Sequence, residues 1–420
     1  MPETIEGALP PRAPLTAWRN SLVVIFALCG VGLASWAARV PRVSVILDLS
    51  PAQLGLLLLG IAIGSIAGLI ASGRLVLHFG TRPVILTTLI GSASGLLLAA
   101  VGTATLGSFS VAFTGLMIFG ACMGACDVAM NVSGAANERA LARSVMPIYH
   151  AFFSIGTVLG AAGGALAEQL GVPLPAHMAI IAALITISAL LVVRFVVPEN
   201  QPAKTPPGAS RIAPPEPAPG RSASSPWKHP RTIAIGVVAL GMAFAEGSAT
   251  DWLSYAMVQG HGSTTTTGAL VFGVFVAAMT VGRFVGVALL DRFGRVRVLR
   301  ASGIVASLGL LLFIFVPIFA VSIVGVVFWG LGASLGFPVA MSAAADDPRT
   351  AAARVSVVAT IGYLAFLVGP PAIGFIAGGI GILNALLPVL VLVAGAAIAS
   401  AAARTPLISS STVPPEHPAQ

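Results

Sequence analysis

The stretch Val287-Ala-Leu-Leu-Asp291-Arg292-Phe293-Gly294-Arg295 lies between two apolar runs, and a related stretch, Gly73-Arg-Leu-Val-Leu77-His78-Phe79-Gly80-Thr-Arg82, lies 214 residues earlier. The match extends outward at the same offset, because Gly68, Leu75, Phe79 and Gly80 correspond to Gly282, Leu289, Phe293 and Gly294. A repeat at this distance predicts that the chain is built from two related halves.

The composition is that of a polytopic membrane protein. Of the 420 residues, 57% are hydrophobic and 9% are charged, and the mean hydropathy is +0.98. Soluble globular proteins carry about 25% charged residues. The net charge of +8 does not indicate nucleic-acid binding, because the basic residues lie in short loops between apolar runs. The sequence also contains no phosphate-binding loop with lysine, no zinc-ligand spacing and no nucleophile–base arrangement, so we expect no enzyme activity, no cofactor and no metal.

A membrane-spanning helix needs about 20 mostly apolar residues. Twelve runs meet this requirement, which predicts an all-α membrane protein in two six-helix halves. The runs are 20–41, 53–77, 84–103, 107–132, 146–169, 177–197, 232–257, 267–290, 298–318, 320–343, 354–377 and 383–403. The predicted organisation is an N-terminal tail at 1–19, a first half at 20–197, a Pro-rich linker at 198–231, a second half at 232–403 and a C-terminal tail at 404–420.

The distribution of lysine and arginine predicts the orientation in the membrane. Twenty of the 22 basic residues fall on one side if the N-terminus is cytoplasmic, and Arg39 and Arg42 fall on the other. Cytoplasmic loops carry an excess of basic residues. We therefore expect both termini, the linker and the loop around Asp291 to be cytoplasmic, in a multi-pass protein of the inner membrane.

The loop motif at residues 287–295 resembles the G-x-L-x-D-R-x-G-R motif of the major facilitator superfamily. The copy at residues 73–82 has Leu77 where the motif usually has aspartate. The resemblance extends over the whole chain through the span count, the linker and the repeat. It implies two halves that rock about a substrate site near the midplane of the membrane. It also implies gating roles for Asp291, Arg292 and Arg295, although the positive-inside pattern alone would explain the two arginines.

Within this superfamily the chain resembles the fucose-permease-like branch. The residues that carry this likeness are Asp127-x-x-x-Asn131, Tyr149-His150-Ala-Phe-Phe-Ser154-Ile-Gly156, Ala245-Glu246 and Phe337-Pro338. It is also similar to the YbjJ-type inner membrane proteins, in the segments 36–41, 243–252 and 332–338. Those proteins are permeases without an assigned substrate. The sequence departs from fucose permeases in the first span, where they carry an acidic residue and this chain has Arg39.

Asp127 lies inside an apolar run, where a carboxylate costs roughly 2.5 to 3.5 kcal/mol on insertion scales. Asn131 is four residues further on, on the same helical face. The functional interpretation is a proton-carrying carboxylate beside a hydrogen-bonding amide, and the alternative is a structural pair. Glu246 is the second candidate for proton or substrate contact.

Asp251 follows Glu246 by five residues, so the two side chains point about 140° apart on a helix. At an offset of 212, Asp251 corresponds to Arg39. This symmetry suggests a salt bridge between Arg39 and Asp251 that closes the outer mouth. The alternative is that each side chain reaches water separately.

Three further residues are candidates for polar contacts with substrate. They are Tyr149, His150 and Tyr363, with interfacial positions as the alternative. The run Gly156-x-x-x-Gly160-Ala-Ala-Gly163-Gly164 resembles a stretch of drug/proton antiporters, but close packing of helices through small residues is the stronger explanation. The leading hypothesis is proton-coupled uptake of a small polar solute by a monomer in the lipid bilayer. The alternatives are efflux by proton antiport and a non-transporting membrane sensor or scaffold.

Overall fold

The computed structural model describes residues 12–141, 143, 145–198, 226–346 and 350–404. Every regular element in these residues is helical, and twelve spans are long and apolar enough to cross a membrane. The predicted all-α fold with twelve spans is confirmed.

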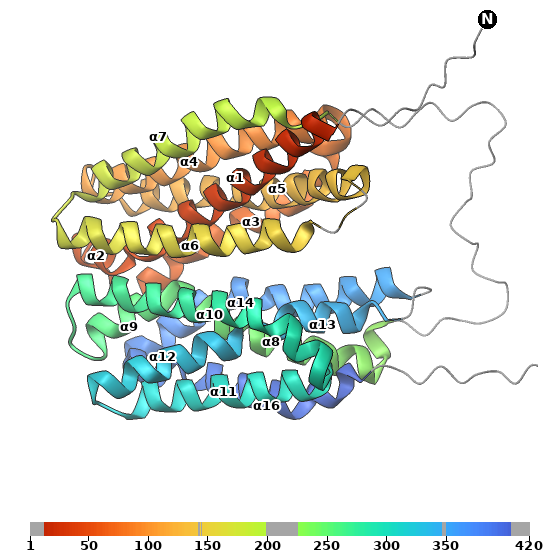
Figure 1. Ribbon diagram of the computed structural model, residues 1–420. Coiled ribbons are helices and arrows are strands. Elements are labelled where there is room, and N and C mark those ends of the chain that lie inside the picture. Colours follow the sequence, from red (N-terminus) through yellow and green to blue (C-terminus); the bar gives the residue numbers. More distant parts are fainter. Residues whose placement is uncertain (1–11, 142, 144, 199–225, 347–349, 405–420) are drawn as a thin grey trace, which may run out of the picture.

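The helices form two bundles that lie side by side (Figure 1). The first contains α1 (Arg12–Ala37), α2 (Val40–Ile46), α3 (Pro51–Phe79), α4 (Thr81–Ala104), α5 (Phe109–Leu141), α6 (Met146–Gln169), α7 (Leu174–Val192) and the short η1 (Val193–Phe195). The second contains η2 (Pro226–Lys228), α8 (Pro230–Ser248), η3 (Ala249–Leu253), α9 (Ser254–Gln259), α10 (Thr265–Phe293), α11 (Arg295–Phe315), α12 (Phe319–Ala333), α13 (Gly336–Ala344), α14 (Ala351–Ile380), α15 (Ile382–Ala385), α16 (Leu387–Ala399) and η4 (Ser400–Ala403).

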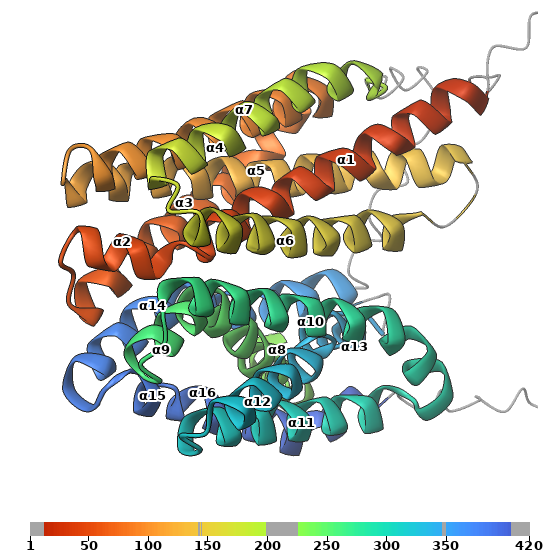
Figure 2. The ribbon, with the colours of Figure 1, turned by 60° about the vertical axis from the view of Figure 1, so that its left-hand side comes forward.

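The start of α1, the start of α8 and the end of η4 lie at the same end of the molecule (Figures 1 and 2). At this end the side chain of Arg231 on α8 donates from Nε to the carbonyl oxygen of Ala402 at 3.0 Å. We call this the terminal end and the opposite one, where α2 meets α3, the far end.

The sequence repeat corresponds to a repeat of structure. Helices α3 and α10 begin with the same kind of cap at the 214-residue offset, because the hydroxyl of Ser50 accepts from Gln53 N and that of Thr264 accepts from Thr267 N. They also end alike, at Gly80 and Gly294, with φ of 80° and 73° and ψ of 166° and 158°. These backbone angles are essentially restricted to glycine.

The first span of each half is interrupted, and the two interruptions lie at equivalent positions, 212 residues apart in the sequence. Helix α1 ends at Ala37 and α2 begins at Val40, so Arg39 lies in the break. The corresponding segment η3 is π-helical and contains Asp251. A π-helical turn is rare and often marks a functional site.

The two bundles contact each other through α3 with α14 and through α6 with α10. At the far end the approach is close enough to need glycine: a Cβ on Gly55 would lie 2.5 Å from the carbonyl oxygen of Pro370, and a Cβ on Gly374 would lie 2.5 Å from that of Pro51. Along α6 and α10, Gly273 faces Ala161. The far ends of the halves are therefore in direct contact.

Several predicted boundaries differ from the structure. Residues 12–19 were expected in a polar tail, but they belong to α1, because Leu15 and Trp18 are buried and Trp18 Nε1 donates to Ser133 Oγ at 3.0 Å. The end of the predicted linker, from Pro226, is helical. Residues 1–11, 199–225 and 405–420, which hold the rest of the linker and tails, lie outside the described residues.

Helix α5 continues nine residues beyond its apolar run. Its polar last turns are held by hydrogen bonds that hydropathy does not register: Asn137 Nδ2 donates to the carbonyl oxygen of Leu15 at 3.1 Å. The Glu138 carboxylate accepts the backbone N–H groups of Val145 and Met146 at 2.7 and 2.8 Å, which caps the start of α6.

Candidate functional site

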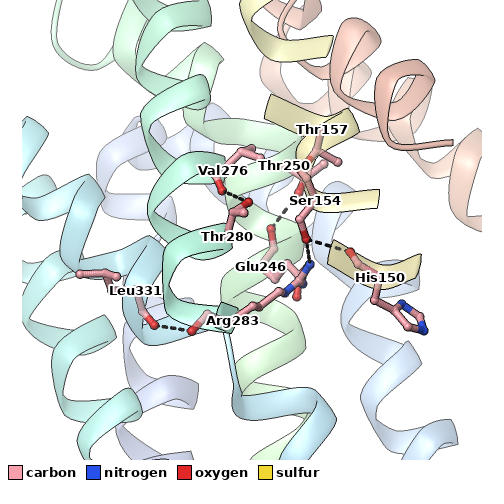
Figure 3. Close-up of polar contacts among 10 residues, drawn as sticks. His150, Ser154, Thr157, Glu246, Thr250, Val276, Thr280, Arg283 and Leu331 are labelled. Atoms are coloured by element: carbon pink, nitrogen blue, oxygen red, sulfur yellow. Dashed lines mark hydrogen bonds and ion pairs between the residues drawn. The ribbon is translucent and has the colours of Figure 1, made fainter. Parts of the chain in front are cut away.

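An ion pair within the second half also contacts the first half. Arg283 on α10 donates from Nη2 to Glu246 Oε1 on α8 at 2.9 Å, and from Nη1 to Ser154 Oγ on α6 at 3.1 Å. Figure 3 shows the guanidinium between these two side chains. The side chains of Arg283 and Glu246 are 28% and 26% exposed. The pair is thus half-buried.

Local hydrogen bonds position the groups around this pair. Ser154 Oγ donates to the carbonyl oxygen of His150 one turn earlier, which leaves its lone pairs for Arg283. The hydroxyl of Thr250 in η3 donates to the carbonyl oxygen of Glu246 on α8 at 3.0 Å (Figure 3). The side chain of His150 is exposed and lies within electrostatic range of Arg283.

Asp127 and Asn131 form the predicted pair on α5. Asn131 Nδ2 donates to the carbonyl oxygen of Asp127 at 2.7 Å and to its Oδ1 at 3.1 Å. The Asp127 side chain is exposed although it lies in a span, and Tyr363 lies on α14 in the other half. Tyr363 is 40% exposed. We group these two residues from opposite halves with Asn131, Glu246, Arg283 and Ser154 and call the group the central polar site.

Tyr149 does not belong to this site, so the prediction of a substrate contact there is wrong for this conformation. Its side chain is fully buried within the first half, stacked on Phe26 at a ring distance of 5.4 Å. Its hydroxyl donates to Asn137 Oδ1 at 2.7 Å. Because His150 is the next residue on the helix, its side chain points in another direction, edge-on to Phe26 and exposed.

The far end holds a second ion pair, which is fully buried. Arg39 Nε lies 3.0 Å from Glu168 Oε2, and both side chains are 2% exposed. Arg39 also donates to the carbonyl oxygen of Val172 at 2.9 Å, and Arg42 is the second cation on Glu168. Thr265 of the other half donates its hydroxyl to Glu168 Oε1 at 2.7 Å. Burial lowers the pKa of Arg39 and Glu168 opposes this effect. Glu168 is thus the acceptor that joins the halves at this end.

The hypothesis of a salt bridge between Arg39 and Asp251 is wrong for this conformation. The reason is the packing of α1 against α6 within the first half, which brings Glu168 to Arg39. Asp251 is partly exposed in η3 and has no ion pair or hydrogen bond with any residue that the structure describes.

The three predicted gating residues of the terminal loop behave differently. Arg295 pairs with Asp346 at the end of α13, at 2.7 Å, and Asp346 also pairs with Arg231 at 2.7 Å. Arg292 lies over the ring of its neighbour Phe293 at 5.4 Å. Asp291 is exposed and forms no ion pair within the described part of the chain. Among the described residues, Arg295 is the one of the three that forms an ion pair with another segment, the residues that follow α13.

Sequence reasoning missed three functional candidates: Ser154, Glu168 and Arg283. Arg283 was assigned to a cytoplasmic segment, yet it lies inside the predicted run 267–290 and inside the observed span Thr265–Gly286. A charge within a span is a signal for function, so this residue was detectable. Glu168 stands in the last turn of its run and resembles an ordinary interfacial residue, so its partners could not be inferred.

Comparison with known proteins places this arrangement in a family. The model described as Major Facilitator Superfamily matches residues 20–370 and 252–419. The chain belongs to the Major Facilitator Superfamily. An uncharacterised MFS-type transporter of Yersinia pestis is 33% identical over 359 residues, which cover 84% of this chain and 87% of the relative. The predicted superfamily is confirmed, and the protein is a multi-pass membrane transporter and not an enzyme.

Two solved structures share the fold of this superfamily member. The nucleoside transporter NupG superposes with a TM-score of 0.69 at 16% identity, covering 92% of this chain and 98% of the other. A variant of the Escherichia coli fucose:proton symporter FucP superposes with a TM-score of 0.61 at 18% identity, with coverages of 92% and 98%. At these identities the likeness concerns the fold alone. The narrower likeness to YbjJ-type proteins stays a prediction.

Proposed function

We propose that the protein carries a small polar solute across the cytoplasmic membrane by proton-coupled uptake, with the terminal end in the cytoplasm. The observation that carries this proposal is the half-buried Glu246–Arg283 pair, which contacts Ser154 of the opposite half at 3.1 Å. Ionisable groups within a membrane span are costly and typically mark a substrate or ion pathway. The nucleoside transporter NupG and the fucose:proton symporter FucP, which share this fold, also carry polar solutes.

The contacts between the halves support alternating access. In this conformation the far end is closed by Glu168 with Thr265 and by α3 with α14, while Asp127 and His150 are exposed. Release of solute would occur toward the terminal end. Loading would require the far-end contacts to separate and the terminal ends to approach, with the central polar site between them.

Asp127 and Glu246 are the proposed proton carriers. A carboxylate at membrane depth is stabilised by a positive partner or by a proton. Asp127 accepts a hydrogen bond from Asn131 but has no cation beside it among the described residues, and Glu246 has Arg283. Protonation from the outer side would therefore alter the charge of the site that meets the solute.

Proton-antiport efflux is the second candidate, on the strength of the Gly156 to Gly164 run. In the structure Gly156 and Gly160 contact the backbone of α1, where a Cβ would lie 2.1 Å from the carbonyl oxygen of Ala27 and 2.5 Å from that of Val31. Close packing accounts for these glycines, which leaves efflux with less support than uptake.

The experiment begins with a thermal-shift screen of the purified protein against sugars, nucleosides, carboxylates and lipophilic cations. Binders are then tested for uptake into proteoliposomes with an acid exterior. We expect acid-stimulated uptake of a polar solute, and a loss of about tenfold or more in Asp127→Asn. Asp48→Asn, an exposed carboxylate at the far end, serves as the matched control.

The outcomes separate the alternatives. If every binder is a lipophilic cation and moves against the proton gradient, the efflux hypothesis replaces uptake. If a binder is not transported in either direction, the transport proposal itself is wrong.

A further inference from the structure

The guanidinium of Arg283 has more donors than the protein uses. Arginine presents five N–H donors in a planar fork. Within the described residues, Arg283 donates one hydrogen bond to Glu246 and one to Ser154. On Glu246 only the Oε1 atom accepts from Arg283. With 28% of its side chain exposed, Arg283 keeps N–H donors that no described residue accepts. This geometry suits an additional acceptor.

We propose that Arg283 binds the carboxylate group of a small monocarboxylate substrate and that Glu246 takes up one proton when it does. This inference rests on the transport function proposed above and names its substrate class. A carboxylate can accept two parallel N–H bonds from an arginine fork, which a sugar hydroxyl cannot do. The resting pair between Arg283 and Glu246 then marks where the substrate anion docks.

The coupling to protons follows from charge balance at one arginine. Arg283 is always positive and, at this depth, needs one anion beside it. In the empty site that anion is Glu246. If a substrate carboxylate takes its place, the Glu246 carboxylate loses its counterion and binds a proton instead. One proton and one monocarboxylate enter together, and both leave together when Glu246 pairs with Arg283 again.

Arg283 is the one cation of the central polar site, which limits the substrate to a single negative charge. His150 on α6 lies within electrostatic range of Arg283, and Asp127 on α5 is the other carboxylate of the central polar site. Asp127 carries no cation beside it, so a second carboxylate on the substrate would meet like charge. A hydroxyl group at the other end of the substrate would instead find acceptors in Asp127 and Asn131.

The test measures binding by thermal shift of the full-length protein at pH 5.5 and 7.5. The probes are L-lactate, D-gluconate and D-galacturonate, each beside an uncharged counterpart: lactamide, D-glucose and D-galactose. We expect the acids alone to bind, at least tenfold more tightly at pH 5.5 than at pH 7.5. In Glu246→Gln the acids should bind with the tighter affinity at both values of pH, because the glutamine cannot compete for Arg283.

Two further variants keep the result interpretable. Arg283→Gln alone leaves Glu246 unpaired and is prone to misfold, so it is combined with Glu246→Gln to give a neutral pair. This double variant should fold and bind no acid, in contrast to Glu246→Gln. In His150→Gln the pH dependence should persist, since the proton resides on Glu246.

The inference is overturned if no acid of the panel binds at pH 5.5, if the uncharged counterparts bind equally well, or if the double variant still binds acids. It is also overturned if His150→Gln removes the pH dependence and Glu246→Gln does not. Acid-stimulated uptake of an uncharged solute would leave the proposed transport function intact while it rejects the substrate class. Binding of acids without any transport would support the ligand class and reject the proposed transport function.

Discussion

At the scale of single residues, burial separates the roles of two ion pairs. The Arg39–Glu168 side chains are 2% exposed, whereas the Arg283–Glu246 side chains are 28% and 26% exposed. A fully buried pair cannot exchange its partner for a solute without large rearrangement. We therefore assign Arg39 and Glu168 to closure of the far end, and Arg283 and Glu246 to the solute.

Glu168→Gln should destabilise the protein by about 3–5 kcal/mol, because it leaves two arginines without their buried counterion. The amide oxygen can still accept from Thr265, so the loss reports the charge and not the contact between the halves. Unfolding in detergent, followed by heat or denaturant, measures it. The control is Asp48→Asn, whose exposed side chain should change stability by less than about 0.5 kcal/mol. Equal stability of the two variants would contradict the assignment.

A pair of tyrosine variants distinguishes structure from function. Tyr149→Phe removes the donor to the buried Asn137 Oδ1 and should cost about 1–3 kcal/mol of stability. Tyr363→Phe alters an exposed group and should leave stability within about 0.5 kcal/mol while it changes solute binding. Thermal unfolding and binding are measured on both. If only Tyr149→Phe impaired solute binding, Tyr149 and not Tyr363 would be assigned to the solute site.

At the scale of helices, the two halves repeat their caps as well as their lengths. Ser50 and Thr264 cap α3 and α10, and the cap hydroxyl accepts from the third residue of the helix in both cases. Gly80 and Gly294 end these helices in the same unusual backbone conformation. The repeat therefore extends to the exact turn chemistry, and equivalent substitutions should have equivalent costs.

Gly80→Ala and Gly294→Ala should each destabilise the protein by a similar amount, about 1–3 kcal/mol. Neither glycine has an atom within 4 Å of an added Cβ, so the cost comes from backbone conformation alone. The measurement is the change in unfolding midpoint of each single variant. Gly163→Ala is a suitable control, because it too has open space for a Cβ but ordinary helical angles. A loss in that control as large as in the other two would refute the conformational explanation.

Hydropathy and the loop repeat predicted the helices well, because both depend on local sequence. The twelve apolar runs correspond to the twelve observed spans. The misjudged boundaries are those where polar residues continue a helix through distant partners, as Asn137 does with Leu15. The breaks near Arg39 and in η3 also escaped prediction, since the apolar pattern continues through them.

At the scale of the whole molecule, the site depends on how two bundles meet. Asp127, Asn131 and Glu246 were predicted because charged or amide groups stand out in apolar runs. Ser154, Glu168 and Arg283 were not, because Glu168 meets Thr265 and Ser154 meets Arg283 across 97 and 129 residues. Such pairings follow from packing between the halves, which a single sequence does not encode locally. Because the two halves pack closely, a disulfide between them can test whether they must separate during transport.

Alternating access requires α6 and α10 to separate, so a disulfide between them should stop transport. A Cβ on Gly273 would lie 3.8 Å from the Cβ of Ala161, which is the typical spacing in a disulfide. In a background whose three natural cysteines are replaced by alanine, we expect Ala161→Cys with Gly273→Cys to cross-link on oxidation, lose uptake, and recover it on reduction. Each single variant should keep its activity under oxidant. A quantitatively cross-linked protein that still transports would show that these helices stay together throughout the cycle, and that the halves move about α6 and α10 instead of parting there.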